Sequence, residues 1–512
     1  MRFIIKLFAK LLTPAAKKFH HALKNPQASQ QAIQKEIFQY IIKSEYGKSL
    51  NIKSITDWHR IPIVAYYDIE KFILQQKETK KPLLTSESIL FYEKTSGSRG
   101  AAKLIPYTKS LLSSFNQMFC VWAHDLIIHG AKFSTGKIYF CISPKLGEKQ
   151  DEIGLKNDSE YLDGWLRWFL SPFLISPRGL NRVGDAEEFK NKLSQTLLLE
   201  EKLEIISIWS PSFLKVILDY IQSNRTRLLL EIGDRLSPQR RQLLLNTEIP
   251  WTQLWQELKL ISCWDSANAA DGAEFLRSLF PNVLVQGKGL LATEAPLTIP
   301  LIEAQGCVPM LNEVFFEFED EAGKIYRLHE LKTGGIYEII ISQKAGLYRY
   351  RIGDRLSVTH FYLNTPCLQF LGRTQEISDL VGEKLHSEFV RQVLDSLPLQ
   401  GTSFKSLVPV KEPQHYILLL DQTNVNPQKL AQQLDEALQQ SPQYRHARLL
   451  NQLQPVRVLI SSHIPEIVAL YKMRSGKKWG DLKHDILSTT PIESELLVEL
   501  EKETMSVNKI IS

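Results

Sequence analysis

The chain has 512 residues, which exceeds the size at which a single core usually keeps growing, so two or more domains are expected. Hydrophobic residues make up 44% and charged residues 23% of the sequence, a balance typical of globular proteins that excludes a wholly disordered chain. The net charge of +6 arises from 62 basic and 56 acidic residues, and this even mixture does not indicate a nucleic-acid-binding protein.

The N-terminal segment, residues 1–24, is apolar but carries Arg2, Lys6 and Lys10 on one expected helix face. These charges exclude the uncharged core of a secretory signal, and no segment of the chain is long enough to span a bilayer. Residues 1–23 are compatible with weak contact to an anionic membrane surface. The favoured alternative is a helix docked on its own domain with its lysines in solvent.

The cysteines and histidines predict neither disulfides nor a zinc site. The five cysteines are odd in number and far apart, and the twelve histidines show no HExxH motif or clustered ligand spacing. We therefore expect a protein of the reducing cytoplasm. The oligomeric state cannot be read from the sequence.

Helices come first along the chain and then alternate with strands. Residues 27–45 have helical apolar spacing, and Gly47 follows as a helix stop. From about residue 110 to 350, helical stretches such as 111–127 alternate with β-rich runs such as 137–143, which is typical of an α/β domain. Within this part, strands separated by glycine turns begin at residue 313 and predict a β-meander that ends at 361.

Residues 380–512 contain a further group of predicted helices and strands. Helical spacing at 386–397 and 426–440 alternates with strand-like runs at 414–420 and 455–461. This set is large enough for a small α+β domain, and we place the domain boundary near residues 373–379.

The stretch YEKTSGSRGAAKLIPYT, residues 92–108, has the composition of a phosphate-binding loop. Its glycines allow a tight backbone, its hydroxyl groups can donate hydrogen bonds, and Lys103 supplies a positive charge. It is not a Walker A loop, because the lysine lies three residues past the second glycine and Leu104 follows it. By itself, the run is more typical of a loop that uses these residues for turn geometry.

Two later stretches add acidic candidates. In GKGLLATEAPLTIP, residues 287–300, Thr293 and Glu294 follow an expected strand and a glycine-flanked turn. In AGLYRYRIGD, residues 345–354, a β-rich segment ends in Asp354, whose carboxylate can accept both hydroxyls of a ribose. Taken singly, Glu294 has the alternative of a surface carboxylate and Asp354 that of a turn residue.

The order and spacing of these stretches, together with Arg373, resemble the adenylate-forming enzymes. Among them, the chain resembles the auxin-responsive family of acyl acid-amido synthetases, as a bacterial-type member. The resemblance covers nearly the full chain. IPIVAYYDIEKFI at residues 61–73 is similar to the family's VPxxxYE segment, KLIPYT at 103–108 to the run after its loop, and AGLYRYRIGD to its most specific signature.

This resemblance implies a fold class and domain boundaries. The fold is a large α/β N-terminal adenylate-forming domain with a β-meander, followed by a small α+β C-terminal domain on a hinge. Residues 1–373 would bind ATP and the acyl substrate, residues 374–379 would form the hinge, and residues 380–512 would form the mobile small domain.

The resemblance also implies that the chain uses ATP and Mg²⁺. Glu294 would ligate Mg²⁺, for which a hard carboxylate oxygen is suitable. Asp354 would bind the ribose hydroxyls, with Arg373 nearby at the hinge. The other implied nucleotide contacts, to phosphates or adenine, are Thr95, Ser96, Gly97, Ser98, Gly100, Lys103, Leu291, Ala292 and Thr293. The implied catalytic residues are Lys103, Glu294 and Lys483.

Lys483 belongs to SGKKWGDLKHDIL, residues 475–487, which is similar to the family's late run GKLGGQHK. The match places it at the lysine that enters the active site during adenylation, although Asp481 and Leu482 depart from the pattern. The alternative is a solvated basic face, shared with Lys472, Arg474, Lys477 and Lys478.

The acyl pocket is less legible than the nucleotide site. IISIWSPSFL, residues 205–214, resembles the family segment that lines the carboxylate substrate, so Trp209 and Phe213 are candidates for an apolar wall or for core aromatics. In the loop, Arg99 stands where members of the resembled family usually have a small polar residue. It either alters the contact to phosphate or points to solvent. The identities of the acid and of the amine acceptor are not readable.

The implied reaction has two steps. A carboxylate attacks the α-phosphorus of ATP to give an acyl adenylate and pyrophosphate, and an amine, expected to be an amino acid, then displaces AMP. Two alternatives stand beside it: a ligase that transfers the acyl group to a thiol such as coenzyme A, and a non-catalytic nucleotide-binding scaffold.

Overall fold

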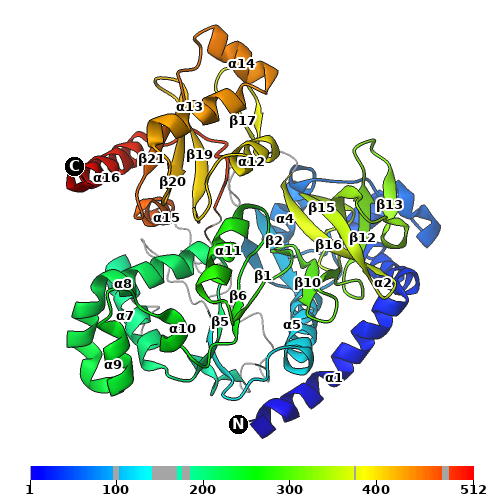
Figure 1. The fold of residues 1–512 in the computed structure, drawn as a ribbon. Helices are drawn as coiled ribbons and strands as arrows, with labels where there is room; N and C mark the ends of the chain where they lie inside the picture. The colour runs from blue at the N-terminus through cyan, green and yellow to red at the C-terminus, as the bar shows by residue number, and fades with distance from the viewer. Residues whose placement is uncertain are drawn as a thin grey trace. The chain divides into compact units, whose positions relative to one another are not determined.

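The protein is described by a computed structural model, which covers residues 2–95, 103–140, 166, 170–175, 185–373, 376–474, 482 and 484–511. The chain divides into two compact units, each assembled from segments that are distant in the sequence (Figure 1). The first unit contains residues 1–140, 149–174 and 286–374. The second contains residues 141–148, 175–285 and 375–512.

Helix α2 shows how the helices of the first unit are attached to its sheet. Pro26 occupies the first helical position, where a missing amide donor does no harm. The buried Gln30 side chain donates to the carbonyl oxygens of Leu311 and Val314 at 2.7 and 2.8 Å, and accepts from the Phe316 amide at 2.8 Å. The helices of this unit are α1 (Arg2–Lys24), α2 (Pro26–Ile41), α3 (Glu45–Ser49), η1 (Ile55–Arg60), α4 (Tyr66–Thr79), α5 (Lys109–His129) and η6 (Leu328–Glu330).

Gly47 does not end a helix, contrary to the expectation from sequence. Helix α2 ends at Ile41, and the Ser44 side chain caps the short helix α3 by accepting from the Gly47 amide at 3.0 Å. A Cβ atom at Gly47 would lie 1.9 Å from the Ile41 carbonyl oxygen. The glycine therefore permits a close backbone approach between consecutive helices, and helical spacing alone does not reveal this requirement.

The main sheet of the first unit is antiparallel and has five strands in the order β13-β12-β14-β15-β16. Strands β14 to β16 are sequential neighbours, as in a meander. The short strand β13 instead lies outside β12, so the almost fully buried β12 pairs with β14. The strands are β12 (Phe315–Glu319), β13 (Ile325–Arg327), β14 (Ile336–Ser342), β15 (Tyr350–Tyr362) and β16 (Thr365–Arg373).

Three two-stranded hairpins accompany this sheet, and two of them carry the stretches singled out from the sequence. The hairpins are β1 (Ile89–Lys94) with β2 (Leu104–Thr108), β8 (Leu291–Ala292) with β9 (Ala295–Pro296), and β10 (Thr298–Leu301) with β11 (Gly306–Pro309). Strands β3 (Lys137–Phe140) and β4 (Leu174–Ile175) complete the described strands up to residue 175.

In the second unit, residues 185–285 alternate strands and helices, as expected for an α/β arrangement. Strand β5 is buried along its whole length and pairs in parallel with β6, which agrees with the apolar runs of a sheet covered on both faces. The elements are α7 (Ala186–Leu199), β5 (Leu203–Ser207), α8 (Pro211–Ile232), η4 (Gly233–Arg235), α9 (Pro238–Leu244), α10 (Trp251–Leu254), β6 (Leu260–Ser262), η5 (Ala267–Ala269), α11 (Ala270–Leu279) and β7 (Leu284–Gln286).

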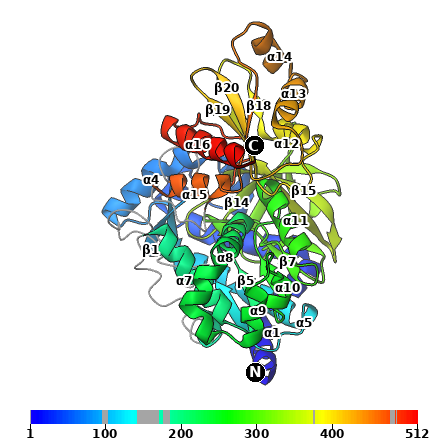
Figure 2. The same ribbon diagram turned by 60° about the vertical axis from the view of Figure 1, so that its left-hand side comes forward.

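The C-terminal part of the second unit is built on the three-stranded sheet β19-β20-β21, with an antiparallel and a parallel pair. Helices α15 and α16 lie side by side and share an apolar cluster with this sheet (Figure 1, Figure 2). The elements are β17 (Ile377–Ser378), β18 (Leu385–His386), α12 (Ser387–Asp395), β19 (Lys405–Val410), β20 (His415–Leu420), α13 (Pro427–Leu438), α14 (Pro442–Leu449), β21 (Arg457–Ile460), α15 (Ile464–Arg474) and α16 (Ser494–Ile511).

Ion pairs join the two parts of the second unit. Lys405 contacts Asp271 at 2.9 Å, and the nearly buried Lys190 pairs with Glu466. The compact unit therefore combines residues 175–285 with the C-terminal residues, and its last boundary falls between residues 374 and 375. The division into a large domain, a hinge and a mobile small domain stays a prediction.

No helix in the described ranges combines the length and the apolar character needed to cross a membrane.

Candidate active site

A tight hairpin in the first unit positions Thr293 and Glu294. These residues form the two-residue connection between β8 and β9, because Ala292 pairs directly with Ala295. The Tyr107 hydroxyl donates to the Thr293 carbonyl oxygen at 2.8 Å, and the Gln343 side chain donates to the Glu294 carbonyl oxygen at 3.4 Å. Glu294 is buried, with only 7% of its surface exposed, so it is not the surface carboxylate that stood as the alternative.

Asp354 and Arg373 face each other across the last strand pair of the main sheet. They are direct partners in the β15–β16 register, and Arg373 Nε donates to Asp354 Oδ1 at 2.8 Å. The pairing of β15 with β14 is irregular between Arg351 and Arg355, where Gly353 has a φ of +89°. This bulge, which needs glycine, sets the direction of the adjacent Asp354 side chain, and Asp354 is buried.

Lys103 follows the candidate phosphate loop and leads into strand β2. Its carbonyl oxygen accepts from the Thr95 amide at 2.9 Å, which closes the base of the loop. The Lys103 ammonium lies over the Tyr66 ring, 5.5 Å from its centroid, and the Tyr66 hydroxyl accepts from the Leu104 amide at 2.9 Å. Tyr66 thus positions both the backbone and the charge at the end of the loop.

The tertiary structure brings Lys103, Glu294, Asp354 and Arg373 into electrostatic range of one another. Burial raises the pKa of the Glu294 carboxyl, and the Asp354 charge raises it further, whereas the Arg373 and Lys103 charges lower it. Buried carboxylates beside two cations form a site that can accept an additional positive ion or a ligand that carries both hydroxyls and phosphates.

Two buried hydroxyls border this cluster without a hydrogen-bond partner among the described residues. They belong to Tyr350, which is fully buried, and to Thr95 at the base of the loop. Burial raises the pKa of Tyr350, and the Glu294 charge adds to this effect. Unsatisfied buried hydroxyls are rare, so both groups are candidates for hydrogen bonds to a ligand.

Sequence reasoning missed three tyrosines of the site, namely Tyr66, Tyr107 and Tyr350. Each lies inside a motif that was quoted for the resemblance, so the motifs carried the signal although no role was assigned to the rings. The motifs also meet in space, because the Val64 amide donates to the Arg349 carbonyl oxygen at 3.1 Å, beside a bridge between Val64 and Tyr350.

Some predicted residues contribute little to this geometry. Leu291 and Ala292 form strand β8 and are partly exposed. In the second unit, Phe213 is buried against Phe189, with 6.3 Å between ring centroids, whereas Trp209 is partly exposed and contacts Trp264 at 5.6 Å. The packing of Phe213 agrees with a core aromatic, and the acyl-pocket assignment stays a prediction. Ser96, Gly97, Ser98, Arg99, Gly100 and Lys483 lie outside the described residues.

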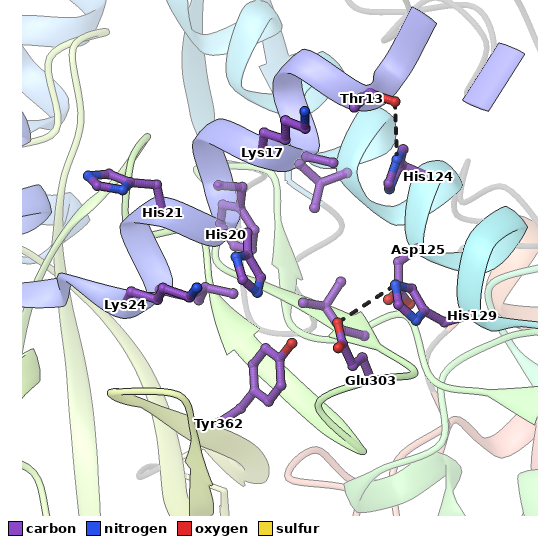
Figure 3. A pocket seen from close by; sticks show the side chains of 15 residues that line it. Thr13, Lys17, His20, His21, Lys24, His124, Asp125, His129, Glu303 and Tyr362 are labelled. Atoms are coloured by element: carbon purple, nitrogen blue, oxygen red, sulfur yellow. Dashed lines mark hydrogen bonds and ion pairs between the residues drawn. The ribbon is translucent and has the colours of Figure 1, made fainter. Parts of the chain in front are cut away.

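A separate cavity of about 350 Å³ lies in the first unit between α1, α5 and the ends of β10 and β15 (Figure 3). It contains none of the predicted site residues. Its polar lining includes His129, which contacts Glu303 at 3.7 Å, and His124, whose pKa is lowered by burial and by the charge of His129.

Comparison with known proteins identifies the family. Three GH3 profiles match consecutive parts of the chain: the GH3 family N-terminal domain at residues 15–285, the central domain at 307–373 and the C-terminal domain at 386–492. The chain belongs to the GH3 family. Together with the amido synthetases among the similar proteins, these matches confirm the resemblance to the auxin-responsive acyl acid-amido synthetases.

The chain is similar in sequence to a plant protein and in fold to two solved structures. The probable indole-3-acetic acid-amido synthetase GH3.11 of Oryza sativa subsp. japonica is 24% identical over 74% of this chain and 75% of its own length. The structure of the AtGH3.15 acyl acid amido synthetase in complex with 2,4-DB has a TM-score of 0.80, with 18% identity over 96% of both chains. The 2-hydroxyisobutyryl-CoA ligase in complex with 2-HIB-AMP has a TM-score of 0.52, with 13% identity over 96% of this chain and 93% of its own. These matches confirm the expected fold class.

The described residues fit the implied magnesium ion if a nucleotide supplies part of its coordination. No group of three or more His, Cys, Asp or Glu side chains in the described ranges could hold a metal ion. Mg²⁺ is commonly held by one or two carboxylates together with substrate phosphates and water, so a single buried Glu294 is a sufficient protein ligand. The residues therefore fit a magnesium ion that arrives with a nucleotide.

Proposed function

We propose that this GH3-family chain activates a carboxylic acid with ATP and transfers the acyl group to an amine, an amino acid, to form an amide. The observation that carries the proposal is the buried Glu294 beside Lys103, Asp354 and Arg373, on strands and a hairpin that also present two unsatisfied hydroxyls. The family match and the amido synthetases among the relatives support the same reaction.

In the first step, a carboxylate oxygen of the acid bonds to the α-phosphorus of ATP, and the bond to the bridging oxygen breaks to release pyrophosphate. Lys103 neutralises phosphate charge, and Asp354 accepts hydrogen bonds from the ribose hydroxyls. Glu294 would hold Mg²⁺, which supplies further charge neutralisation at the phosphates. Thr95, Thr293 and the loop residues Ser96, Gly97, Ser98 and Gly100 would donate to the phosphate oxygens, with Leu291 and Ala292 against adenine.

In the second step, the nitrogen of the amine bonds to the activated carbonyl carbon, the bond to AMP breaks, and the amine proton passes to solvent. No nucleophilic side chain is needed, because positioning and charge neutralisation carry both steps. Lys483 would stabilise charge during the first step and withdraw with the C-terminal residues before the amine enters. Consumption of ATP supports the expected cytoplasmic location.

Transfer to a thiol is the second candidate reaction, and the fold shared with 2-hydroxyisobutyryl-CoA ligase favours it. That likeness is weaker than the likeness to the amido synthetase, with TM-scores of 0.52 against 0.80. The amide reaction is therefore the better supported of the two.

The decisive experiment is acid-dependent exchange of labelled pyrophosphate into ATP, since the first step is reversible. A panel of aromatic, aliphatic and hydroxy acids is tested with Mg²⁺, and each acid that supports exchange is then incubated with amino acids or with coenzyme A. Amide formation supports the proposal, and thioester formation supports the alternative. Nucleotide binding without exchange for any acid would indicate a non-catalytic scaffold.

A further inference from the structure

Helix α1 exposes a continuous apolar stripe near its N-terminal end. Phe3, Leu7 and Leu11 recur at intervals of four residues and expose 77%, 45% and 54% of their surfaces, and Ile4 beside them exposes 40%. Residues spaced by four lie above one another on one face of a helix. Isolated exposed apolar residues are normal, but four on one face of one helix mark an interaction surface.

This stripe is not the face that docks on the first unit. Phe8 and Leu12 are buried and belong to an apolar cluster with Cys120 and Ala123 of helix α5. The docked helix expected as the favoured alternative is therefore present, and the exposed stripe is additional to it. In Figure 1, the N-terminal end of α1 extends beyond the end of α5.

A basic stripe runs beside the exposed apolar stripe. Arg2, Lys6 and Lys10 are exposed and also recur every four residues, one position before Phe3, Leu7 and Leu11. No acidic residue precedes Glu36 in the sequence, so nothing within the helix neutralises this charge. Helix α1 thus has a buried face, an apolar exposed face and a cationic face.

The C-terminal half of α1 keeps the helix in place. The Thr13 hydroxyl lies 3.4 Å from His124 Nε2 of α5, and Figure 3 shows Lys17, His20 and Lys24 beside the cavity that separates α1 from the β10 and β15 ends. Asn364 and Thr365 donate to the carbonyl oxygens of Lys24 and Leu23, both at 2.7 Å. The exposed half is therefore a preformed element attached to the folded unit.

We propose that the N-terminal half of α1 binds the surface of an anionic lipid bilayer. The apolar stripe would enter the boundary between headgroups and acyl chains, and the basic stripe would contact lipid phosphates and carboxylates. Nucleic acid would pair with the cations but leave four apolar side chains in water. A neutral protein groove would cover the apolar stripe but not the adjoining charge. The charge on α1 therefore favours an anionic membrane, and this proposal does not depend on the enzymatic one.

The test is flotation of the full chain with lipid vesicles. Vesicles of phosphatidylcholine with about 30 mol% phosphatidylserine should bind the protein, whereas pure phosphatidylcholine should bind it at least about tenfold more weakly. Raising NaCl from about 0.05 to 0.5 M should weaken binding, because the attraction is screened. The variants Phe3→Ser with Leu7→Ser, and Arg2→Gln with Lys6→Gln and Lys10→Gln, should each lose binding at least about tenfold.

Matched variants distinguish binding by this surface from nonspecific adsorption to vesicles. Leu230→Ser with Leu449→Ser removes two apolar residues that are on average more exposed than Phe3 and Leu7. Lys77→Gln with Lys80→Gln and Lys81→Gln removes three exposed cations elsewhere. Both should bind vesicles as the parent does, and thermal unfolding checks that every variant is folded. Equal binding to both vesicle types, or binding that survives the α1 substitutions, would overturn the proposal. A parent dimer that the Phe3→Ser, Leu7→Ser variant converts to monomers would assign the stripe to a second copy.

Discussion

Arg373 and Asp354 are paired twice, through the backbone register of β15 and β16 and through a 2.8 Å hydrogen bond between Arg373 Nε and Asp354 Oδ1. Arg373 is 41% exposed while Asp354 is 4% exposed in its side chain, so the arginine covers the carboxylate from the solvent side. The second carboxylate oxygen of Asp354, Oδ2, is the acceptor proposed for ribose hydroxyls.

The Asp354→Asn variant should therefore bind ATP poorly. An amide retains the shape but accepts through one oxygen only, and hydrogen bonds to charged groups are the stronger ones. We expect the KM for ATP in pyrophosphate exchange to rise by about tenfold or more, with a smaller change in kcat. Glu321→Gln is the control, because Glu321 forms an exposed ion pair with Arg355 at 3.3 Å on the neighbouring turn. Equal KM values for the two variants would show that Asp354 is only structural.

Glu294→Gln keeps the volume of the buried side chain and removes the charge proposed for Mg²⁺. Adenylation should fall by about a hundredfold or more while the fold persists, as expected when a catalytic metal loses its protein ligand. The measurement is pyrophosphate exchange across a magnesium titration, beside the exposed control Glu78→Gln. Because burial raises the pKa of Glu294, loss of its charge should also stabilise the chain without nucleotide or leave its stability unchanged. An unaltered magnesium response would remove Glu294 from the site.

Lys483→Ala should separate the two half-reactions. Acid-dependent pyrophosphate release should be lost, whereas a synthetic acyl adenylate and an amine should still give amide at the parent rate. Lys429→Ala is the matched control, because Lys429 is an exposed lysine of helix α13 in the same C-terminal part, and it should leave both half-reactions unchanged. If Lys483→Ala adenylates normally, the mobile lysine is to be sought at Lys472 or Lys477.

Arg349 should be essential for stability rather than chemistry. Its Nε donates to Glu317 Oε2 at 2.9 Å and its Nη1 donates to the Ile61 carbonyl oxygen at 2.8 Å, in a nearly buried position. Arg349→Gln should lower the free energy of unfolding by about 2 kcal/mol or more, because the buried Glu317 then keeps only the more exposed Arg327, at 3.4 Å, as a cation partner. Arg351→Gln, which breaks a more exposed pair with Glu319, should lower it by less than about 1 kcal/mol. Denaturant unfolding of both variants measures the difference, and similar losses would contradict it.

His484 should make stability depend on pH. Burial lowers its pKa to about 4, and the Lys472 charge acts in the same direction against the opposing Asp485 and Asp271 charges. Its Nε2 contacts the Lys405 carbonyl oxygen at 2.7 Å. An unfolded histidine binds a proton below about pH 6.5, whereas the folded one stays neutral, so the free energy of unfolding should fall as pH drops from about 6.5 towards 4.

The slope from this group is at most about 1.4 kcal/mol per pH unit. His484→Gln cannot take up the proton and should remove that part of the pH dependence while it keeps a donor to Lys405. The check is denaturant unfolding of both chains between pH 7 and 4.5, which covers most of the interval between the unfolded and folded pKa values. Parallel curves for the parent and the variant would show that His484 is not responsible.

Local sequence patterns determined most of the elements. The helical spacing at 426–440 corresponds to α13 (Pro427–Leu438), and the β-rich run at 414–420 corresponds to β20 (His415–Leu420). Such patterns depend on the periods of 3.6 and 2 residues and on turn chemistry, which act over short distances in the chain. The family motifs are also short contiguous stretches, so they can be recognised in the sequence without knowledge of the tertiary structure.

Long-range packing decided the rest. The position of β13 at the edge of the sheet, which leaves β12 to pair with β14, depends on which strand is buried. The period of a strand does not specify its partner. In the sequence, Glu294 cannot be distinguished from an ordinary acidic residue of a turn. Only the tertiary structure, with the Tyr107 and Gln343 contacts to its hairpin, places it in the interior beside Lys103 and Arg373. The exposed stripe of Phe3, Leu7 and Leu11 likewise became visible only when Phe8 and Leu12 were found against α5, since an amphipathic sequence does not specify which of its apolar residues the fold will cover.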